Sequence, residues 1–198
     1  MHKHIDSIRA YKHLLRANVL IMQEKWALPT DPIEHYLLTG FSKPMLFFST
    51  HNFNRRPHEG MMVNIKPSIK IETFTNVHDQ HGQVVYLHLR THAQSFEVCA
   101  VNRRPNSNVK GLTDLLEQVP LDICRIVLGD FNIDHLKPSK NLQVLQNHMS
   151  SLNLLPTLKG ETTEFHSCLD QIDASLQAYK TGVLETSWSD QKTIWINL

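Results

Sequence analysis

The sequence lacks an excess of charge of either sign, and it lacks any long apolar run. Lys and Arg number 20 against 19 Asp and Glu, which gives a formal net charge of +1 with histidine neutral. This balance excludes a strongly basic nucleic-acid-binding protein of the kind that net charge alone reveals. No apolar run approaches the ~18–20 residues of a membrane span, so we expect no membrane partner. The length suits one domain, and we expect a single domain over residues 1–198.

Cysteine is scarce as well. Cys99, Cys124 and Cys168 form an odd, widely spaced set without a Cys-x-x-Cys unit. A disulfide framework is therefore not expected, and a reduced intracellular setting, nuclear or cytoplasmic, is the simpler interpretation. The opening segment, residues 1–15, is amphipathic and mixed in charge, and it lacks the apolar core of a secretory signal.

Histidine, by contrast, is abundant, with 13 residues. The pairs His78/His81 and His88/His92 suggest either a zinc site or ordinary solvated and turn histidines. In a strand, residues i and i+4 are ~13 Å apart at ~3.3 Å per residue, which favours the second interpretation. The basic cluster "NRRPH" (54–58) is interpreted as a solvated loop, with contact to a nucleic-acid backbone as the alternative.

Apolar periodicity and turn residues predict interleaved helices and strands. Helices are expected at residues 4–16, at 111–119 before Pro120, and at 139–152 with Ser139 as the N-cap. Strands are expected at 18–23, 44–50, 61–66, 69–77, 82–92, 95–105 and 123–130. The continuous apolar runs 18–23 and 123–128 are typical of strands in the middle of a sheet covered on both faces. The pattern predicts an α/β fold with a mixed or partly antiparallel sheet.

Polar side chains follow several of the predicted strands, where the strand fixes the backbone and the loop presents side chains. Glu24 follows the first apolar run, and it has a simple explanation as a solvated residue before a loop. The block "GDFN" places Asp130 and Asn132 after the central strand, either as an Asx-type turn or as part of a site. Asp170 stands inside the apolar run "HSCLDQI", where a buried carboxylate needs a partner. Asp190, in "SWSDQ", is a weak signal alone.

Taken in order, "NVLIMQEKW", "VCAVNRRPNSN", "IVLGDFN", "HSCLDQI" and "WSDQK" resemble the motif series of the endonuclease/exonuclease/phosphatase superfamily. The resemblance is strongest to the endonuclease domains of non-LTR (LINE-type) retrotransposons, and it runs from about residue 5 to residue 196. It implies a DNase I-like fold, in which a two-sheet β-sandwich is flanked by helices. It also implies DNA nicking by phosphodiester hydrolysis with Mg²⁺ or Mn²⁺, and association with a reverse transcriptase within a retroelement polyprotein.

The resemblance also implies roles for individual residues. Glu24 would be the metal ligand, as a hard cation held by one carboxylate, waters and substrate phosphate requires. Asp190 would line the metal and water site. Asp130 would orient or deprotonate the attacking water, and Asn132 would donate a hydrogen bond to a phosphate oxygen. Asp170 would support a catalytic histidine placed directly after Asp190.

Three departures from the family pattern bear on activity. The histidine position is Gln191, which can donate a hydrogen bond but carries no proton. Because such proton transfer contributes ~10²–10⁴-fold, its loss costs roughly 3–5 kcal/mol of barrier. Asn102 replaces the family's Tyr beside Arg103, in the segment predicted to bind substrate. The family's first strand is expected to be missing, because residues 1–4 are too short to form it.

Two hypotheses therefore stand side by side. In the first, the chain is a Mg²⁺-dependent DNA endonuclease domain of retroelement origin whose activity is impaired at Gln191. In the second, it is an inactive relic, or a module that binds nucleic acid or protein on the same fold. A phosphatase acting on small phosphoesters is a third hypothesis within that fold.

Overall fold

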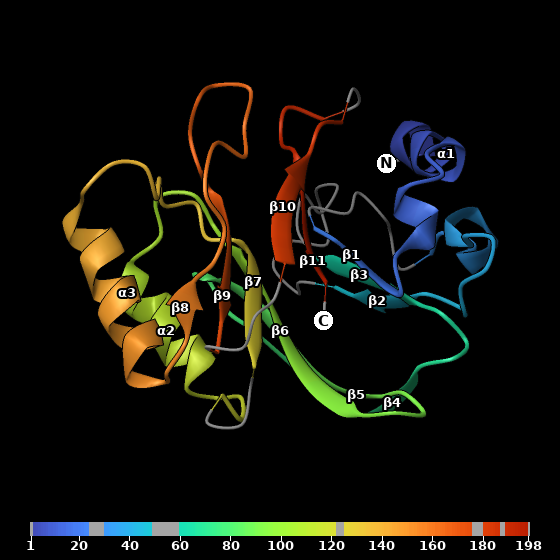
Figure 1. The fold of residues 1–198 in the computed structure, drawn as a ribbon, viewed down its shortest axis with the longest axis horizontal. Helices are drawn as coiled ribbons and strands as arrows, with labels where there is room; N and C mark the ends of the chain where they lie inside the picture. The colour runs from blue at the N-terminus through green and yellow to red at the C-terminus, as the bar shows by residue number, and fades with distance from the viewer. Residues whose placement is uncertain are drawn as a thin grey trace. The chain divides into compact units, whose positions relative to one another are not determined.

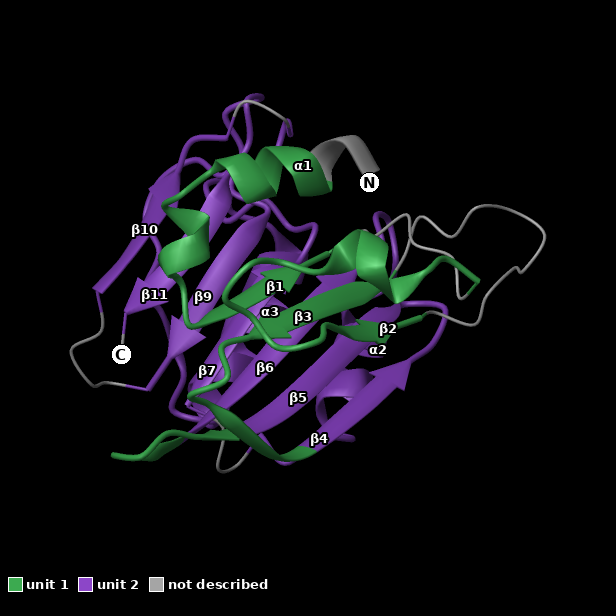
Figure 2. Ribbon diagram, turned by 90° about the vertical axis from the view of Figure 1, so that its right-hand side faces the viewer, with its two compact units in different colours: residues 1–73, 89–95 green, residues 74–88, 96–198 purple. Residues whose placement is uncertain are grey.

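The computed structural model describes residues 2–23, 30–48, 60–121, 125–175, 180–186 and 189–197. The predicted metal ligand Glu24, the thiol Cys124 and the 54–58 cluster lie outside the described residues. The chain divides into two compact units (Figure 2). Unit 1 comprises residues 1–73 and 89–95, and unit 2 comprises residues 74–88 and 96–198.

Unit 1 contains a small antiparallel sheet in the strand order β1-β3-β2. Its elements are α1 (His2–Ala10), η1 (Leu14–Arg16), β1 (Val19–Met22), η2 (Ile33–Tyr36), β2 (Met45–Phe47) and β3 (Met61–Ile65). The helix predicted at 4–16 is thus interrupted, because α1 ends at Ala10 and a separate 3-10 turn follows.

The position of β1 corrects the prediction of a central strand at residues 18–23. Within the described sheet β1 lies at an edge, and only Leu20 of its four residues is buried. The central position belongs to β3, whose five residues are all buried. A four-residue apolar run carries no signal that separates an edge strand from a central one.

Unit 2 holds most of a six-stranded mixed sheet in the order β4-β5-β6-β7-β9-β8. The strands are β4 (Lys70–His78), β5 (Gly82–Arg90), β6 (Ser95–Arg103), β7 (Ile126–Asp130), β8 (Leu155–Pro156) and β9 (Asp170–Ala174). β6 and β7 run parallel, while β7 and β9 run antiparallel. A separate antiparallel pair is formed by β10 (Lys180–Leu184) and β11 (Thr193–Asn197). The prediction of a central strand at 123–128 is confirmed in β7.

The helices of unit 2 are α2 (Val109–Leu116) and α3 (Lys140–Ser151). The Ser139 side chain accepts a hydrogen bond from the N–H of Leu142 at 3.1 Å, so the predicted N-cap of α3 is confirmed. α2 begins two residues earlier than predicted, because the Asn108 side chain caps it by accepting from the N–H of Lys110 at 2.9 Å. Among the described residues, no helix is both long and apolar enough to span a bilayer.

Both helices cover one face of the large sheet (Figure 1). Their buried apolar side chains join those of the sheet in one core, which includes Val84, Tyr86, Cys99, Val101, Val127, Leu112, Leu115, Leu142, Leu145 and Met149. Since side chains alternate between the faces of a strand, the neighbours of Val101 and Val127 along β6 and β7 face the other side. That second face carries the polar strand ends.

Asp173 is an exception within the helix-covered face. It is the register partner of Val127, so it lies on the same face as that core residue, and it is 3% exposed. Its Oδ2 atom has no hydrogen-bond partner among the described residues. Burial raises the pKa of Asp173 from 3.8 to about 7.

Asp173 should therefore make stability depend on pH. The folded-state pKa lies above the unfolded-state value, so the folded state binds more protons between pH 3.8 and about 7. The free energy of unfolding should fall as the pH rises through that window, by roughly 4 kcal/mol at ~1.36 kcal/mol per unit. Urea unfolding of Asp173→Asn should show a stability gain above pH 7 that shrinks toward pH 4.

The control is Asp114→Asn, which alters an exposed carboxylate of α2 paired with Lys110. It should change stability by no more than ~0.5 kcal/mol at any pH. An Asp173→Asn protein whose stability follows the wild-type pH dependence would contradict this account of the buried carboxyl.

Candidate functional site

Asn102, Asp130 and Asp170 form one row across three adjacent strands. In the β6–β7 pair Asn102 is the register partner of Asp130, and in the β7–β9 pair Asp130 is the partner of Asp170. Neighbouring strands are ~4.7–4.9 Å apart, so the three residues are next-door neighbours on the face opposite α2 and α3. All three are buried, with exposures of 8%, 1% and 7%. Two predicted catalytic carboxylates and one predicted substrate-binding residue thus meet at one sheet position.

The turn after β7 fixes the orientation of Asn132. Asp130 Oδ1 accepts a hydrogen bond from the N–H of Asn132 at 2.8 Å, which is an Asx-type turn. Asn132 adopts a φ of 48°, a left-handed conformation that asparagine tolerates well. Its Nδ2 donates to the Arg103 carbonyl at 2.7 Å. The "GDFN" block can therefore be both an Asx-type turn and part of a site, because the turn fixes the orientation of the Asn132 amide.

The backbone conformation explains why the "GDFN" block begins with a glycine, Gly129. Its φ is 137°, a region that residues with a Cβ rarely adopt. The residue immediately precedes the Asp130 carboxylate in β7. A side chain at this position would strain the backbone that holds the acid.

Arg103 was predicted to bind substrate. In the structure, its side chain binds backbone carbonyls of the turn after β7. Its side chain is 2% exposed and donates to the carbonyls of Phe131 (3.1 Å), Asn132 (2.9 Å) and Ser107. Burial lowers the pKa of Arg103, and the charge of Asp130 opposes that effect. The sequence could not separate the two roles, because they depend on which face of β6 the side chain occupies.

Gln191 reaches the row from the C-terminal segment. Its Nε2 donates a hydrogen bond to Asp130 Oδ2 at 3.1 Å. The backbone is held on both sides, because Gln191 N donates to Ser189 Oγ at 3.1 Å and Thr186 Oγ1 donates to the Gln191 carbonyl at 3.0 Å. Asp190, the residue before it, is exposed.

The electrostatics of Asp130 suit a proton acceptor. Burial raises the pKa of Asp130, and the hydrogen bonds from Asn132 and Gln191 together with the Arg103 charge limit the rise. A carboxylate whose pKa is raised takes up a proton more readily than an exposed one. The Gln191 amide can donate a hydrogen bond to this carboxylate, but it cannot relay a proton.

Two nearby residues with proton-transfer or nucleophilic chemistry do not replace the missing histidine. Burial and the Asp170 charge raise the pKa of the Cys168 thiol to about 11, so it stays protonated and is a poor nucleophile. Burial lowers the pKa of His135 to about 4, against the effect of Asp134, so this imidazole is neutral at physiological pH. Its Nδ1 lies 3.0 Å from Nε2 of Gln171. Gln171 alternates with Asp170 along β9 and so occupies the other face.

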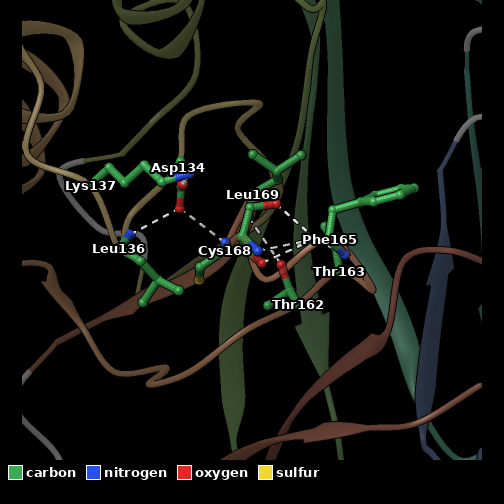
Figure 3. Close-up of polar contacts among 9 residues, drawn as sticks. Asp134, Leu136, Lys137, Thr162, Thr163, Phe165, Cys168 and Leu169 are labelled. Atoms are coloured by element: carbon green, nitrogen blue, oxygen red, sulfur yellow. Dashed lines mark hydrogen bonds and ion pairs between the residues drawn. The ribbon is translucent and has the colours of Figure 1, made fainter.

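Thr162 supports the candidate site, although no sequence motif indicated this role. It is fully buried, and its Oγ1 accepts hydrogen bonds from the N–H of Leu169 at 3.0 Å (Figure 3) and from the N–H of Asp170 at 3.1 Å. Its carbonyl accepts from the N–H of Lys192 at 2.8 Å. The residue therefore ties the start of β9 to the Gln191 segment. The segment "TTEF" (162–165) does not predict this role, because the bonds connect segments that are distant in the sequence.

The same loop makes a second connection to the C-terminal segment. Thr163 and Gln191 form an isolated antiparallel bridge, and the N–H of Glu164 donates to the Asp190 carbonyl at 3.0 Å. Thr163 Oγ1 also lies 2.7 Å from Ser167 Oγ, which closes the loop on itself. Asp190 and Gln191 are thus positioned by backbone contacts to the loop that precedes Asp170.

The fit to a metal ion depends on ligand type. The row and its surroundings offer carboxylate and amide oxygens, which hard cations such as Mg²⁺ and Mn²⁺ prefer, and Mg²⁺ often takes one or two protein carboxylates together with substrate. Within the described part of the chain, no group of three or more His, Cys, Asp or Glu residues is placed to hold a metal ion. The donor chemistry fits the ion, and the ligand roles of Glu24 and Asp190 stay predictions.

Replacing Thr162 should test the connection between β9 and the C-terminal segment. Thr162→Val keeps the shape but leaves the buried N–H of Asp170 and the half-buried N–H of Leu169 without their acceptor, and a buried unsatisfied group costs ~1–3 kcal/mol. We expect urea unfolding to show a loss of about 2–4 kcal/mol for Val. Thr162→Ser retains the hydroxyl and should stay within about 1.5 kcal/mol of wild type. Equal stability of the Val and Ser variants would contradict the assigned bonds.

Comparison of the sequence finds no matching family model and no significant match among curated proteins. Comparison of the structure does find matches. The endonuclease domain of TRAS1, a telomere-specific non-LTR retrotransposon, superposes with a TM-score of 0.66 at 12% identity, over 100% of this chain and 91% of that domain. An endonuclease/exonuclease/phosphatase family protein from Leptotrichia buccalis C-1013-b gives 0.67 at 16% identity, over 100% and 92%.

A third similar structure is mannosyl-6-phosphatase Bt3783 of Bacteroides thetaiotaomicron VPI-5482, with a TM-score of 0.68 at 12% identity, over 98% of this chain and 90% of that one. These structures include a nuclease domain and a phosphatase, so proteins with different activities share this similarity in fold. The identities are too low to transfer an activity, but the superpositions cover 98–100% of this chain. The large six-stranded sheet, the smaller sheets and the few helices thus form the mixed α/β, DNase I-like fold of the endonuclease/exonuclease/phosphatase superfamily.

Proposed function

We propose that the chain is a divalent-metal-dependent DNA endonuclease domain of retroelement origin, which nicks one strand by phosphodiester hydrolysis. The observation that carries this proposal is the single row of Asn102, Asp130 and Asp170, onto which Gln191 reaches from the C-terminal segment. Four strand-end or loop residues from distant positions meet on one face of the sheet. Each belongs to a motif that resembles the retrotransposon endonucleases, whose fold the chain shares.

Asp130 is the group best suited to activate water. Its carboxylate is almost fully buried, and burial raises its pKa toward the range in which a general base works well. Asn132 lies beside it with one amide N–H committed to the Arg103 carbonyl. The second N–H of the same nitrogen is then held in a fixed direction, in which it can donate to a phosphate oxygen.

Mg²⁺ or Mn²⁺ would be held by Glu24 and Asp190, with waters and substrate phosphate completing the coordination. The bound ion would supply stabilisation of the negative charge that develops on the phosphate during hydrolysis. Asp190 is exposed, so its carboxylate is accessible to both ion and solvent. DNA would be the partner that delivers the phosphate.

Gln191 should lower the rate of this reaction. The family places a histidine here, which can carry a proton and a positive charge, while the amide only donates a hydrogen bond to Asp130. Loss of a positioned acid or base costs ~10²–10⁴-fold in rate. We therefore propose that the chain, with Gln191 at this position, cleaves DNA slowly.

The alternative is a binding module without catalysis, and the same bond favours it. The Gln191 amide already donates to the Asp130 carboxylate at 3.1 Å, so in this arrangement one oxygen of the base accepts a bond from a group that cannot pass a proton on. Such a site could still hold a phosphate through Asn132. A phosphomonoester substrate, as the name of the similar mannosyl-6-phosphatase suggests for that protein, is the further alternative.

A nicking assay on supercoiled plasmid with Mg²⁺ or Mn²⁺ separates these functions. We expect slow nicking by the chain as it stands and an increase of ~10²-fold or more in Gln191→His, because the imidazole restores proton transfer. Glu24→Ala and Asp130→Ala, each made in the Gln191→His background, should abolish the gain. Asp114→Ala, which alters an exposed carboxylate of α2, is the matched control and should leave nicking unchanged.

Brisk nicking by the unmodified chain that survives Glu24→Ala would show that the site is assigned wrongly. Absence of nicking in the Gln191→His protein, combined with measurable DNA binding, would support the binding module. Turnover of a small phosphomonoester with no plasmid nicking would support the phosphatase.

A further inference from the structure

The carboxylates of the row sit at the last rung of a strand pair. The β7–β9 ladder runs from Ile126 opposite Ala174 to Asp130 opposite Asp170, and no described rung of that ladder lies beyond this one. Ends of paired strands open locally at low cost in free energy, since fewer bonds hold them. The two acids therefore lie where fraying would begin, unless something beyond the ladder holds the two chains together.

Beyond that rung, hydrogen bonds continue between the segment that leaves β7 and the segment that leads into β9. The N–H of Phe131 donates to the Leu169 carbonyl at 2.9 Å, and the N–H of His135 donates to the Cys168 carbonyl at 2.9 Å. In the opposite direction, the N–H of Cys168 donates to Oδ1 of Asp134 at 3.1 Å (Figure 3). The Asp134 side chain thus adds a third hydrogen bond between the two segments beyond the Asp130–Asp170 rung.

Asp134 is well suited to this task. The same Oδ1 accepts from the N–H of Leu136 at 3.1 Å, which forms a local turn, and Oδ2 lies 3.0 Å from Nζ of Lys137. Burial raises the pKa of Asp134, but the hydrogen bonds from Lys137, Cys168 and Leu136 outweigh it, and the pKa lies below its usual value. The group is therefore ionised at neutral pH, and its bonds are of the stronger, charge-assisted kind.

A local turn alone does not explain this geometry. The bond to Leu136 would satisfy an Asx-type turn, as at Asp130. The bond to Cys168 spans 34 residues of sequence and ends two residues before Asp170. The carboxylate thus connects the loop after one acid to the loop before the other.

We propose that Asp134 is a positioning residue of the candidate site, which holds the Asp130 turn and the start of β9 at their working separation. The inference rests on the proposed function for its catalytic consequence. The residue acts through the backbone of Cys168, and no contact with substrate is assigned to it. Its substrate-independent consequence is protection of the Cys168 amide from exchange with solvent.

The test compares Asp134→Ala, which removes the acceptor, with Asp134→Asn, which keeps an oxygen at Oδ1 without the charge. Both are made in the full chain carrying Gln191→His, with Asp114→Ala as the matched control. Hydrogen exchange at Cys168 is measured by NMR, and kcat and KM are measured with a nicked-plasmid readout. Melting curves establish that each variant folds.

In Asp134→Ala we expect Cys168 to exchange ~10-fold faster or more, since one charge-assisted bond is lost. The kcat should fall ~10- to 100-fold with KM within about twofold, because a displacement of about 1 Å of a reacting group costs up to ~10²-fold. Asp134→Asn should give intermediate values of both quantities, because it keeps the acceptor oxygen and loses the charge that strengthens the bond. The control should match the parent in both.

A wild-type exchange rate at Cys168 in Asp134→Ala would overturn the inference, and so would an unchanged kcat in an active parent. If Asp134→Ala does not fold, Asp134→Asn decides. An intermediate exchange rate with the parent's melting temperature supports the inference, and parental values of exchange and kcat overturn it. If the parent shows no nicking, the proposed function fails, and the exchange rates alone decide the role of Asp134.

Discussion

The candidate site depends on one loop, residues 162–170, which is hydrogen-bonded to both of the other segments that form it. Thr162 Oγ1 binds the backbone at the start of β9, and its carbonyl binds Lys192. On the other side, the loop joins the turn after β7 through Leu169 and Cys168. Asp130 and Asp170 are themselves paired at the last described rung of the β7–β9 ladder. The bonds of the loop hold the two chains together beyond that rung and connect the Gln191 segment to them.

Burial then gives the assembled groups their chemistry. The carboxyl of Asp130 accepts hydrogen bonds from the N–H of Asn132 and from the Gln191 amide, and the charge of Arg103 favours its ionised form. Burial raises its pKa, while these donors keep a carboxylate tolerable in a place where an unpaired one would be costly. The helix-covered face follows a different rule. There Asp173 is buried without such donors among the described residues, and its pKa rises to about 7.

Much of this arrangement could be predicted from local sequence. The Ser139 cap and the continuous strand β7, which ends in Asp130, depend on short stretches of chain, and the structure confirms both. The roles of Arg103 and Thr162 could not be predicted, because each depends on contacts with segments far away in sequence. The edge position of β1 and the burial of Asp173 likewise follow from strand order, which no single run of residues encodes.

The central claim is that the row of Asn102, Asp130 and Asp170 borders a divalent-cation and phosphate site. The most direct measurement is paramagnetic line broadening by Mn²⁺ in the NMR spectrum of the full chain, with and without a short DNA duplex. The account predicts that the amide signals of Asn132, Asp170 and Gln191 broaden first, and that DNA strengthens the effect. Broadening that begins at α3, on the far face of the sheet, and leaves those three signals sharp would contradict it.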